Sequence, residues 1–344
     1  ANSSIGIVGI HNYWTGADIT SPTDWNTAAN WSDGQVPGTS CPTVKVPVVA
    51  INKYPVLSSG PMATINNLQI DANASVTISG NTIQIAGGIT NNGIFDVTDG
   101  TLELNGTSGA QSIDGSLFMT NTVKNLIISN TVNVANTAND TLNILGALSF
   151  GKASAGLNTG DNITLKSSQA ATASLGVLTA GNTINGNVTV ERYINTGMVG
   201  SQHHKTWQLL AIPTTGQTIR ASWMEGAGAA NDDPHSGYGT QITSNVAGAA
   251  TWPTPGFDAL TAAPSMKTYN TATDGYDGVP KTDMPIYDQR GYLVFVRGDR
   301  IVIGVNQAAN QTILRTTGKL FTLAPNAPPS SSVGAGQFTS VGNP

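Results

Sequence analysis

The chain has 344 residues and a formal net charge of −5, and only 10% of its residues are charged. Ordinary soluble domains carry about 25% charged residues, whereas here Asn, Thr, Ser and Gly replace the helix-favouring Glu and Lys. The composition therefore argues against a helical protein. The lack of any Lys- or Arg-rich run also excludes the phosphate-neutralising surface that nucleic-acid binding requires.

The same composition limits disulfide bonding and membrane association. The single cysteine, Cys41, excludes an intrachain disulfide. No apolar run approaches the ~20 residues of a membrane helix, and no basic cluster would attract anionic lipids, so we expect no membrane insertion. Because the chain begins at Ala1 without a signal peptide, we expect a processed mature segment.

Residues 1–60 predict an N-terminal strand followed by a Trp-rich cap. The apolar side chains of the strand are Ile5, Ile7, Val8 and Ile10. Chain termini are usually polar and frayed, so an apolar terminus predicts burial. The strand either pairs within its own domain or is donated to a neighbouring copy, because strand addition to an open sheet edge is a known mode of assembly.

Three tryptophans, Trp14, Trp25 and Trp31, follow in a polar, Gly- and Asn-rich segment. Tryptophan buries a large area and can still bond its N–H when packed. We expect a structural plug over the open end of a β stack, with a sugar-stacking platform as the alternative.

Residues 61–194 predict a parallel β-helix. Short segments alternate apolar and polar residues, which is the strand period, and Gly and Asn separate them. The expected strands are 64–71, 75–79, 82–86, 101–104, 123–129, 141–145, 162–165 and 187–190. Coils of ~20 residues would stack their Ile, Leu and Val into one continuous core. An antiparallel sandwich of two similar halves is the alternative.

A weak internal duplication accompanies these strands. Segment 65–70 (Ile-Asn-Asn-Leu-Gln-Ile) matches 123–128 (Val-Lys-Asn-Leu-Ile-Ile), and 82–87 matches 141–146. A third pair, 101–104 and 162–165, keeps a similar separation. Each copy has room for about three coils of the usual solenoid length.

Residues 195–344 predict a β-sandwich, Ig-like or jelly-roll-like, that continues beyond the given chain. Aromatic residues, Pro and charges become more frequent here, and the short repeats stop. The expected strands are 207–212, 291–296, 301–305, 311–315 and 320–323, and 224–265 is loop-like.

No motif in the sequence predicts catalysis. Nucleophile-elbow and phosphate-binding glycine patterns are absent, and only Asp96 and Asp99 lie close together among the acids of the predicted β-helix. We therefore expect neither an enzyme nor a cofactor, and a polysaccharide-degrading β-helix enzyme stays the weakest alternative. Residues 274–278 (Asp-Gly-Tyr-Asp-Gly) loosely suggest a Ca²⁺ loop but lack its ligand spacing, which favours a turn.

Several segments resemble one group of proteins. They are 14–16, 24–31 (Asp-Trp-Asn-Thr-Ala-Ala-Asn-Trp), 36–37, 65–68, 186–194, 207–213, 216–219 and 291–299. This set resembles the large extracellular, adhesin-like surface proteins exported by the type IX secretion system. The resemblance implies a secreted protein at the cell surface, and it carries no catalytic residues. The C-terminal sorting domain usual in that group is missing from this sequence.

Two functional hypotheses follow. The first is a structural or adhesive surface protein, assembling with copies of itself as a pilus-like fibre through the donor strand that holds Ile5, Ile7, Val8 and Ile10. The second is a carbohydrate-binding module that stacks glycans on loop aromatics. The candidate stacking residues are Trp223, Trp252, Tyr238 and Tyr276.

Overall fold

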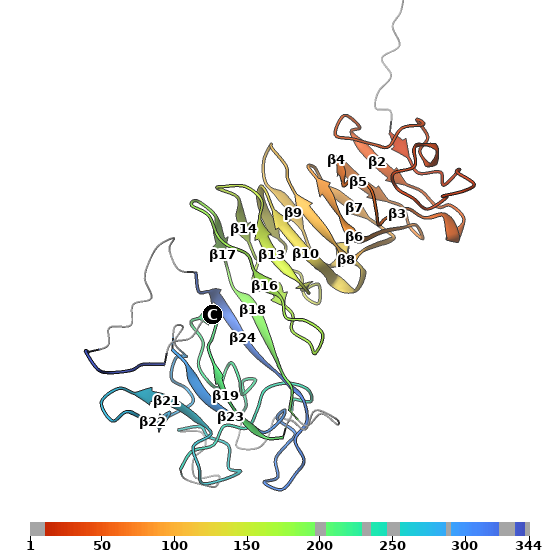
Figure 1. Ribbon diagram of the computed structural model, residues 1–344. Helices are drawn as coiled ribbons and strands as arrows, with labels where there is room; N and C mark the ends of the chain where they lie inside the picture. The colour runs from red at the N-terminus through yellow and green to blue at the C-terminus, as the bar shows by residue number, and fades with distance from the viewer. Residues whose placement is uncertain are drawn as a thin grey trace, which may run out of the picture. The chain divides into compact units, whose positions relative to one another are not determined.

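The computed structural model describes residues 11–196, 204–228, 235–245, 255–286, 290–322 and 334–340. The chain divides into two compact units, one formed by 1–165 with 173–186 and the other by 166–172 with 187–344. Both units are built on strands (Figure 1). In the described residues the helices are short 3₁₀ turns, Ala28–Asn30, Ile51–Lys53, Gly115–Leu117 and Met119–Asn121. None of these is long and apolar enough to cross a membrane.

The first unit is a β-helix of about seven turns, as the sequence predicts. Its strands form three ladders, and every pairing within them is parallel. The first ladder comprises β3 (Val56–Leu57), the first halves of β6 (Ser75–Ile85) and β8 (Ile94–Leu104), the start of β10 (Thr122–Ile128), β12 (Leu142–Ile144) and β15 (Ile163–Leu165). The second comprises β4 (Ala63–Ile65), the second halves of β6 and β8, the rest of β10, β13 (Ala147–Phe150) and β16 (Ser174–Leu175).

The third ladder is split into two sheets. One contains β1 (Asn12–Tyr13), β2 (Thr43–Val46), β5 (Asn67–Ile70) and β7 (Ile89–Asn91), and the other contains β9 (Gln111–Ile113), β11 (Thr131–Val134), β14 (Gly156–Asn158) and β17 (Thr183–Asn185). Because all three ladders are parallel, the alternative of an antiparallel sandwich for 61–194 is wrong.

Columns of aliphatic side chains fill the β-helix. In the second ladder Ile83 lies opposite Leu102, which lies opposite Leu126 and then Leu148. All four are fully buried. Each coil therefore buries its apolar side chains against the coils before and after it, which is how a solenoid obtains a core from segments too short to fold alone.

The internal duplication marks corners with the same local hydrogen bond. The Oδ1 atom of Asn67 accepts a hydrogen bond from the N–H of Gly88 (2.7 Å), and Oδ1 of Asn125 accepts one from Ala147 (2.9 Å). The matched corners lie one ladder apart, however, because 67–70 belongs to the third ladder and 125–128 to the second. The two copies therefore share a local turn, and they do not begin at the same corner of a coil.

The three tryptophans form a buried cap. Trp14 and Trp25 are fully buried and Trp31 is 2% exposed. The ring of Trp31 packs edge-on against those of Trp14 and Trp25, with both centroid distances 4.9 Å. The rings are thus structural, and the sugar-stacking alternative for them is wrong because ligand could not reach them.

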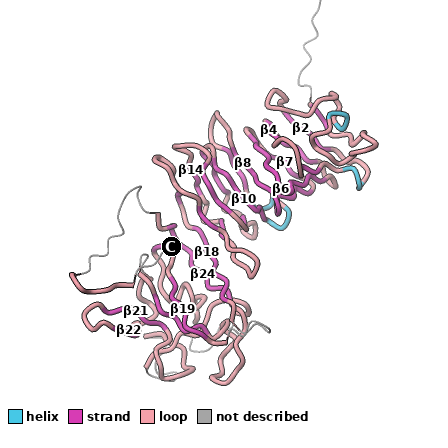
Figure 2. Tube along the Cα trace, viewed as in Figure 1, coloured by secondary structure: helices cyan, strands magenta, loops and turns pink. Residues whose placement is uncertain are grey.

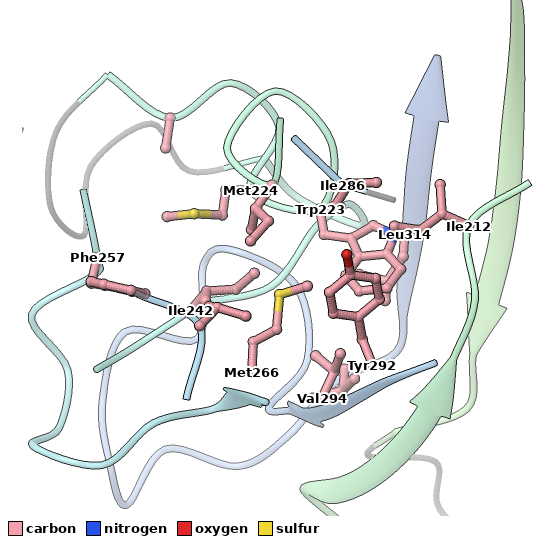
Figure 3. Packing of buried hydrophobic residues seen from close by; sticks show 14 of the residues in the cluster. Ile212, Trp223, Met224, Ile242, Phe257, Met266, Ile286, Tyr292, Val294 and Leu314 are labelled. Atoms are coloured by element: carbon pink, nitrogen blue, oxygen red, sulfur yellow. The ribbon is translucent and has the colours of Figure 1, made fainter. Parts of the chain in front are cut away.

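The second unit is a β-sandwich. One of its sheets pairs β18 (Val188–Ile194), β24 (Thr312–Leu320) and β20 (Thr214–Thr215) antiparallel. The other has the order β19 (Thr206–Leu210), β23 (Tyr292–Val296), β21 (Met266–Asn270) and β22 (Gly275–Gly278), also antiparallel. Long loops account for much of this unit (Figure 2). A single apolar cluster takes side chains from strands of both sheets, including Leu314 and Tyr292 (Figure 3).

Three segments differ from the expected boundaries or elements. Residues 187–194 group with the second unit, and β18 of this segment pairs antiparallel with β24. The β-helix also begins before residue 61, since β2 and β3 already pair within it. Residues 301–305 form turns instead of a strand, because the Asp299 and Gln307 side chains accept hydrogen bonds from their backbone N–H groups.

Leu102→Ala should destabilise the β-helix by about 2–5 kcal/mol, because it opens a cavity in the middle of a buried column. Chemical unfolding followed by circular dichroism measures this as an earlier midpoint for the first unit. Thr90→Ala, at an exposed position on β7, is the control and should change stability by less than about 0.5 kcal/mol. Equal midpoints for both variants would contradict the column.

Candidate ligand-binding face

The four-stranded sheet of the second unit has apolar side chains on both sides. Along β23, Tyr292, Val294 and Val296 are buried in the core cluster, whereas Leu293 and Phe295 point to the opposite side. Tyr292 and Val294 extend from the strand into the cluster (Figure 3). Successive side chains of a strand alternate between its faces, so the outer side of this sheet is apolar where a solvated face is normally polar.

The pairing of these strands places several aromatic rings on this outer side. Trp207 lies opposite Phe295 and Leu209 opposite Leu293, while Tyr269 lies opposite Tyr276 on the next hairpin. Residues directly opposite one another share a face. We call this surface the aromatic face and define it as Trp207, Leu209, Tyr269, Tyr276, Leu293 and Phe295.

The rings of the aromatic face touch in pairs and are open to solvent. The Trp207 and Phe295 centroids are 5.2 Å apart, and those of Tyr269 and Tyr276 are 5.3 Å apart. Trp207 is 42% exposed, Tyr276 40% and Leu209 58%. Monomers seldom leave such neighbouring apolar groups uncovered unless the surface binds something.

Ser340 bounds the aromatic face at one end of β23. The N–H of Gly291 donates to the Ser340 carbonyl (3.2 Å). A Cβ atom on residue 291 would lie 2.1 Å from Ser340 Oγ, so the two segments are in close contact here. On β23 the aromatic face is therefore open from Leu293 onward, and Tyr276 on the edge strand β22 is exposed separately.

Three cations lie near the Trp207 and Phe295 rings. Lys267 is opposite Leu293 on the neighbouring strand, and Arg297 is only 6% exposed. The Lys267 ammonium lies 5.0 Å from the centroid of the Trp207 ring, and the Arg297 guanidinium carbon lies 4.9 Å from that of Phe295. Lys205 Nζ donates to the carbonyls of Gly304 and Val305. Within the described ranges, none of these cations forms an ion pair with a carboxylate.

Burial and mutual repulsion act on two of these charges. Burial, followed by the positive charge of Arg297, lowers the pKa of Lys205. Burial lowers the pKa of Arg297 to about 10, and the charge of Asp258 opposes this shift. Both residues thus carry a positive charge that the surrounding protein compensates only in part.

A buried ion pair lies near Arg297, close enough for the charge of Asp258 to act on it. Arg300 donates from both terminal nitrogens to the two carboxylate oxygens of Asp258, at 3.1 and 3.0 Å, and both side chains are fully buried. Asp258 also accepts a hydrogen bond from the N–H of Ile242 (2.7 Å). Because Asp258 is committed to Arg300, it provides limited compensation for Arg297.

The structure places the predicted glycan-stacking residues apart. Tyr276 belongs to the aromatic face. Tyr238 is half-buried, with the Arg315 guanidinium 3.9 Å from its ring centroid. Trp252 lies outside the described residues. Trp223 is 3% exposed and packs edge-on against Tyr292, so its assignment as a stacking residue is wrong (Figure 3).

Sequence reasoning missed Trp207, Tyr269 and Phe295. The sequence predicts 207–212 and 291–296 only as strands, with no exposed face. A usable signal was present, since a strand with apolar residues at every position needs a covering layer on each side. The register that joins three distant segments into one surface was not readable from any one of them.

The remaining predicted positions have structural contacts or lie outside the description. Ile5, Ile7, Val8 and Ile10 lie outside the described residues. Asp96 accepts hydrogen bonds from Thr98, and Asp99 pairs with Lys124 at 2.7 Å. In the suggested Ca²⁺ loop, Asp274 accepts a hydrogen bond from the Tyr269 hydroxyl and Asp277 one from Asn270. Over the described parts of the chain, no three His, Cys, Asp or Glu side chains are grouped to hold a metal ion.

Comparisons with known protein families, with curated protein sequences and with solved structures each found no match. A binding role for the aromatic face, which Lys205, Lys267 and Arg297 flank, is therefore inferred from its geometry alone. Rings for stacking beside cations form a surface suited to binding rather than to proton transfer.

Asp258→Ala should destabilise the second unit by about 3–5 kcal/mol, because it leaves the Arg300 charge buried without its partner. The double variant Asp258→Leu/Arg300→Met removes both charges and should lose less stability than the single variant. Thermal unfolding of the two variants measures the difference. A double variant less stable than Asp258→Ala would show that the pair itself stabilises the fold.

Proposed function

We propose that this chain is a non-enzymatic adhesive protein of the cell surface, in which the β-helix serves as a spacer and the aromatic face makes the contact. The solvent exposure of Trp207, Leu209 and Tyr276 on one sheet face carries the proposal. Aromatic side chains are enriched in the central, fully buried parts of binding interfaces. A ligand that covers these side chains removes their apolar surface from water, and this burial favours binding.

The β-helix supports the role of a spacer. From β2 onward its coils follow one another 19 to 27 residues apart, as between Ile83 and Leu102 or Leu148 and Leu175. Each coil contacts only its neighbours, so such a stack can be long without a larger core. Outward-facing Asn133, Asn158 and Asn185 are joined side chain to side chain, with hydrogen bonds of 2.7 and 3.1 Å.

The proposed location is extracellular, and the proposed export route is type IX secretion. Both rest on the resemblance of the Trp-rich cap, the β-helix corners and the 291–299 segment to surface proteins of that kind. The proposed partners are glycans.

Trp207→Ala and Tyr276→Ala should each weaken binding to surface polysaccharides by about tenfold, because truncating an aromatic contact at an interface costs on the order of 1–2 kcal/mol. Affinity gel electrophoresis against a panel of neutral and acidic polysaccharides measures this. Tyr13→Ala is the matched control, since Tyr13 is 47% exposed on the β-helix. Unchanged migration of the two variants alongside an active wild type would place the binding surface elsewhere.

A second candidate function is end-to-end assembly through the cap of the β-helix. Ile19 is 95% exposed, Ile51 90% and Val48 60%. The segments that carry Ile19 and Ile51 are joined where Lys53 Nζ donates to the Gly16 carbonyl (3.1 Å). An apolar cap preceded by Ile5, Ile7, Val8 and Ile10 favours association with another copy by strand donation.

Deletion of residues 1–10 should abolish filaments and leave the fold intact, because β1 begins only at Asn12. Negative-stain electron microscopy and circular dichroism of the wild type and the deletion variant test this. Filaments of equal length in both samples, or none in the wild type, would contradict assembly through this strand.

A further inference from the structure

We propose that the ligand of the aromatic face is an acidic polysaccharide, a chain of sugar rings that carry carboxylate or sulfate groups. The inference rests on the proposed function and specifies its substrate class. Two features of the same surface lead to it. The rings are open for stacking, and Lys205 and Lys267 lie beside them without carboxylate partners among the described residues, with the buried charge of Arg297 next to Phe295.

The concentration of positive charge contrasts with the rest of the chain. The protein has only 15 Lys and Arg in 344 residues and a net charge of −5. Lys205, Lys267 and Arg297 nevertheless adjoin the same sheet face, with Lys205 close enough to Arg297 for repulsion to lower its pKa. An anion between them would relieve this repulsion, whereas the net negative charge disfavours polyanions elsewhere on the protein.

Lys267 and Trp207 together match the two parts of an acidic sugar. The ring of Trp207 offers an apolar surface to the C–H face of a pyranose, and the ammonium 5.0 Å from its centroid can pair with a carboxylate or sulfate on that sugar. A neutral glycan would use the ring alone. A non-carbohydrate polyanion would use the ammonium alone.

The width of the sheet gives room for several linked sugars. Trp207 lies on β19 and Tyr276 on β22, the two edge strands of the four-stranded sheet. Adjacent strands are ~4.8 Å apart, so the two outermost rings are separated by about 14 Å across the sheet.

The inference is tested with pairs of polysaccharides that differ only in charge. Polygalacturonate and its methyl ester share one backbone, and carboxymethylcellulose and hydroxyethylcellulose share another. Polyglutamate provides an anion without sugar rings. We expect the full chain to bind the two acidic polysaccharides at least about tenfold more tightly than their neutral counterparts and than polyglutamate, with affinity falling as salt rises.

Lys267→Gln and Lys205→Gln should each weaken acidic binding by about threefold to tenfold and leave neutral binding unchanged. Lys152→Gln, an exposed lysine on the β-helix, is the matched control and should change neither. Circular dichroism confirms that each variant folds.

The outcomes separate the two proposals. Equal binding of acidic and neutral polysaccharides, lost in Trp207→Ala, would overturn the acidic ligand and keep the adhesive face. Equal binding of polyglutamate would overturn the requirement for sugar rings. Failure of the wild type to bind any of the four polysaccharides would overturn both the acidic ligand and the glycan-binding role proposed above.

Discussion

Every strand of this chain has two sides, and the fold depends on burying one of them. In the β-helix the inner side carries stacked aliphatics such as Ile83 and Leu102, and the outer side carries polar residues such as Gln84 and Glu103, which bond to each other at 2.7 Å. Parallel stacking in register keeps both sides consistent from coil to coil. Because outer sides are normally polar, an apolar outer side is informative. The clearest example is the outer side of β19 and β23.

Low charge and many Asn and Gly residues have one structural explanation in the first unit. A coil must turn sharply three times, and its corners lack the regular hydrogen bonds of a strand. Asparagine side chains supply these bonds to the neighbouring coil, as Asn67 and Asn125 do. Glycine lets the side chain of such an asparagine approach closely, since a Cβ on Gly146 would lie 2.4 Å from Asn125 Oδ1 and displace it from its hydrogen bond. Composition here reflects corner chemistry rather than a binding function.

The β-helix could be predicted from sequence because its information is local. Alternation within each short segment and Asn or Gly at each corner recur along the chain, so strand type and coil length are readable without knowledge of distant contacts. The aromatic face could not be predicted in this way. Trp207, Tyr269 and Phe295 come together only through antiparallel pairing of segments separated by long loops. Trp223 shows the converse, since a tryptophan in a turn-rich segment is buried by packing against the distant Tyr292.

Oxidative footprinting of the full chain with and without polygalacturonate tests the central claim most directly. Hydroxyl radicals label exposed aromatic side chains, so bound ligand reduces labelling where it covers them. The account predicts protection of Trp207 and Tyr276, with unchanged labelling of Tyr13 on the β-helix, which is exposed to a similar extent. Protection confined to the β-helix, or bound polysaccharide without protection of Trp207, would contradict it.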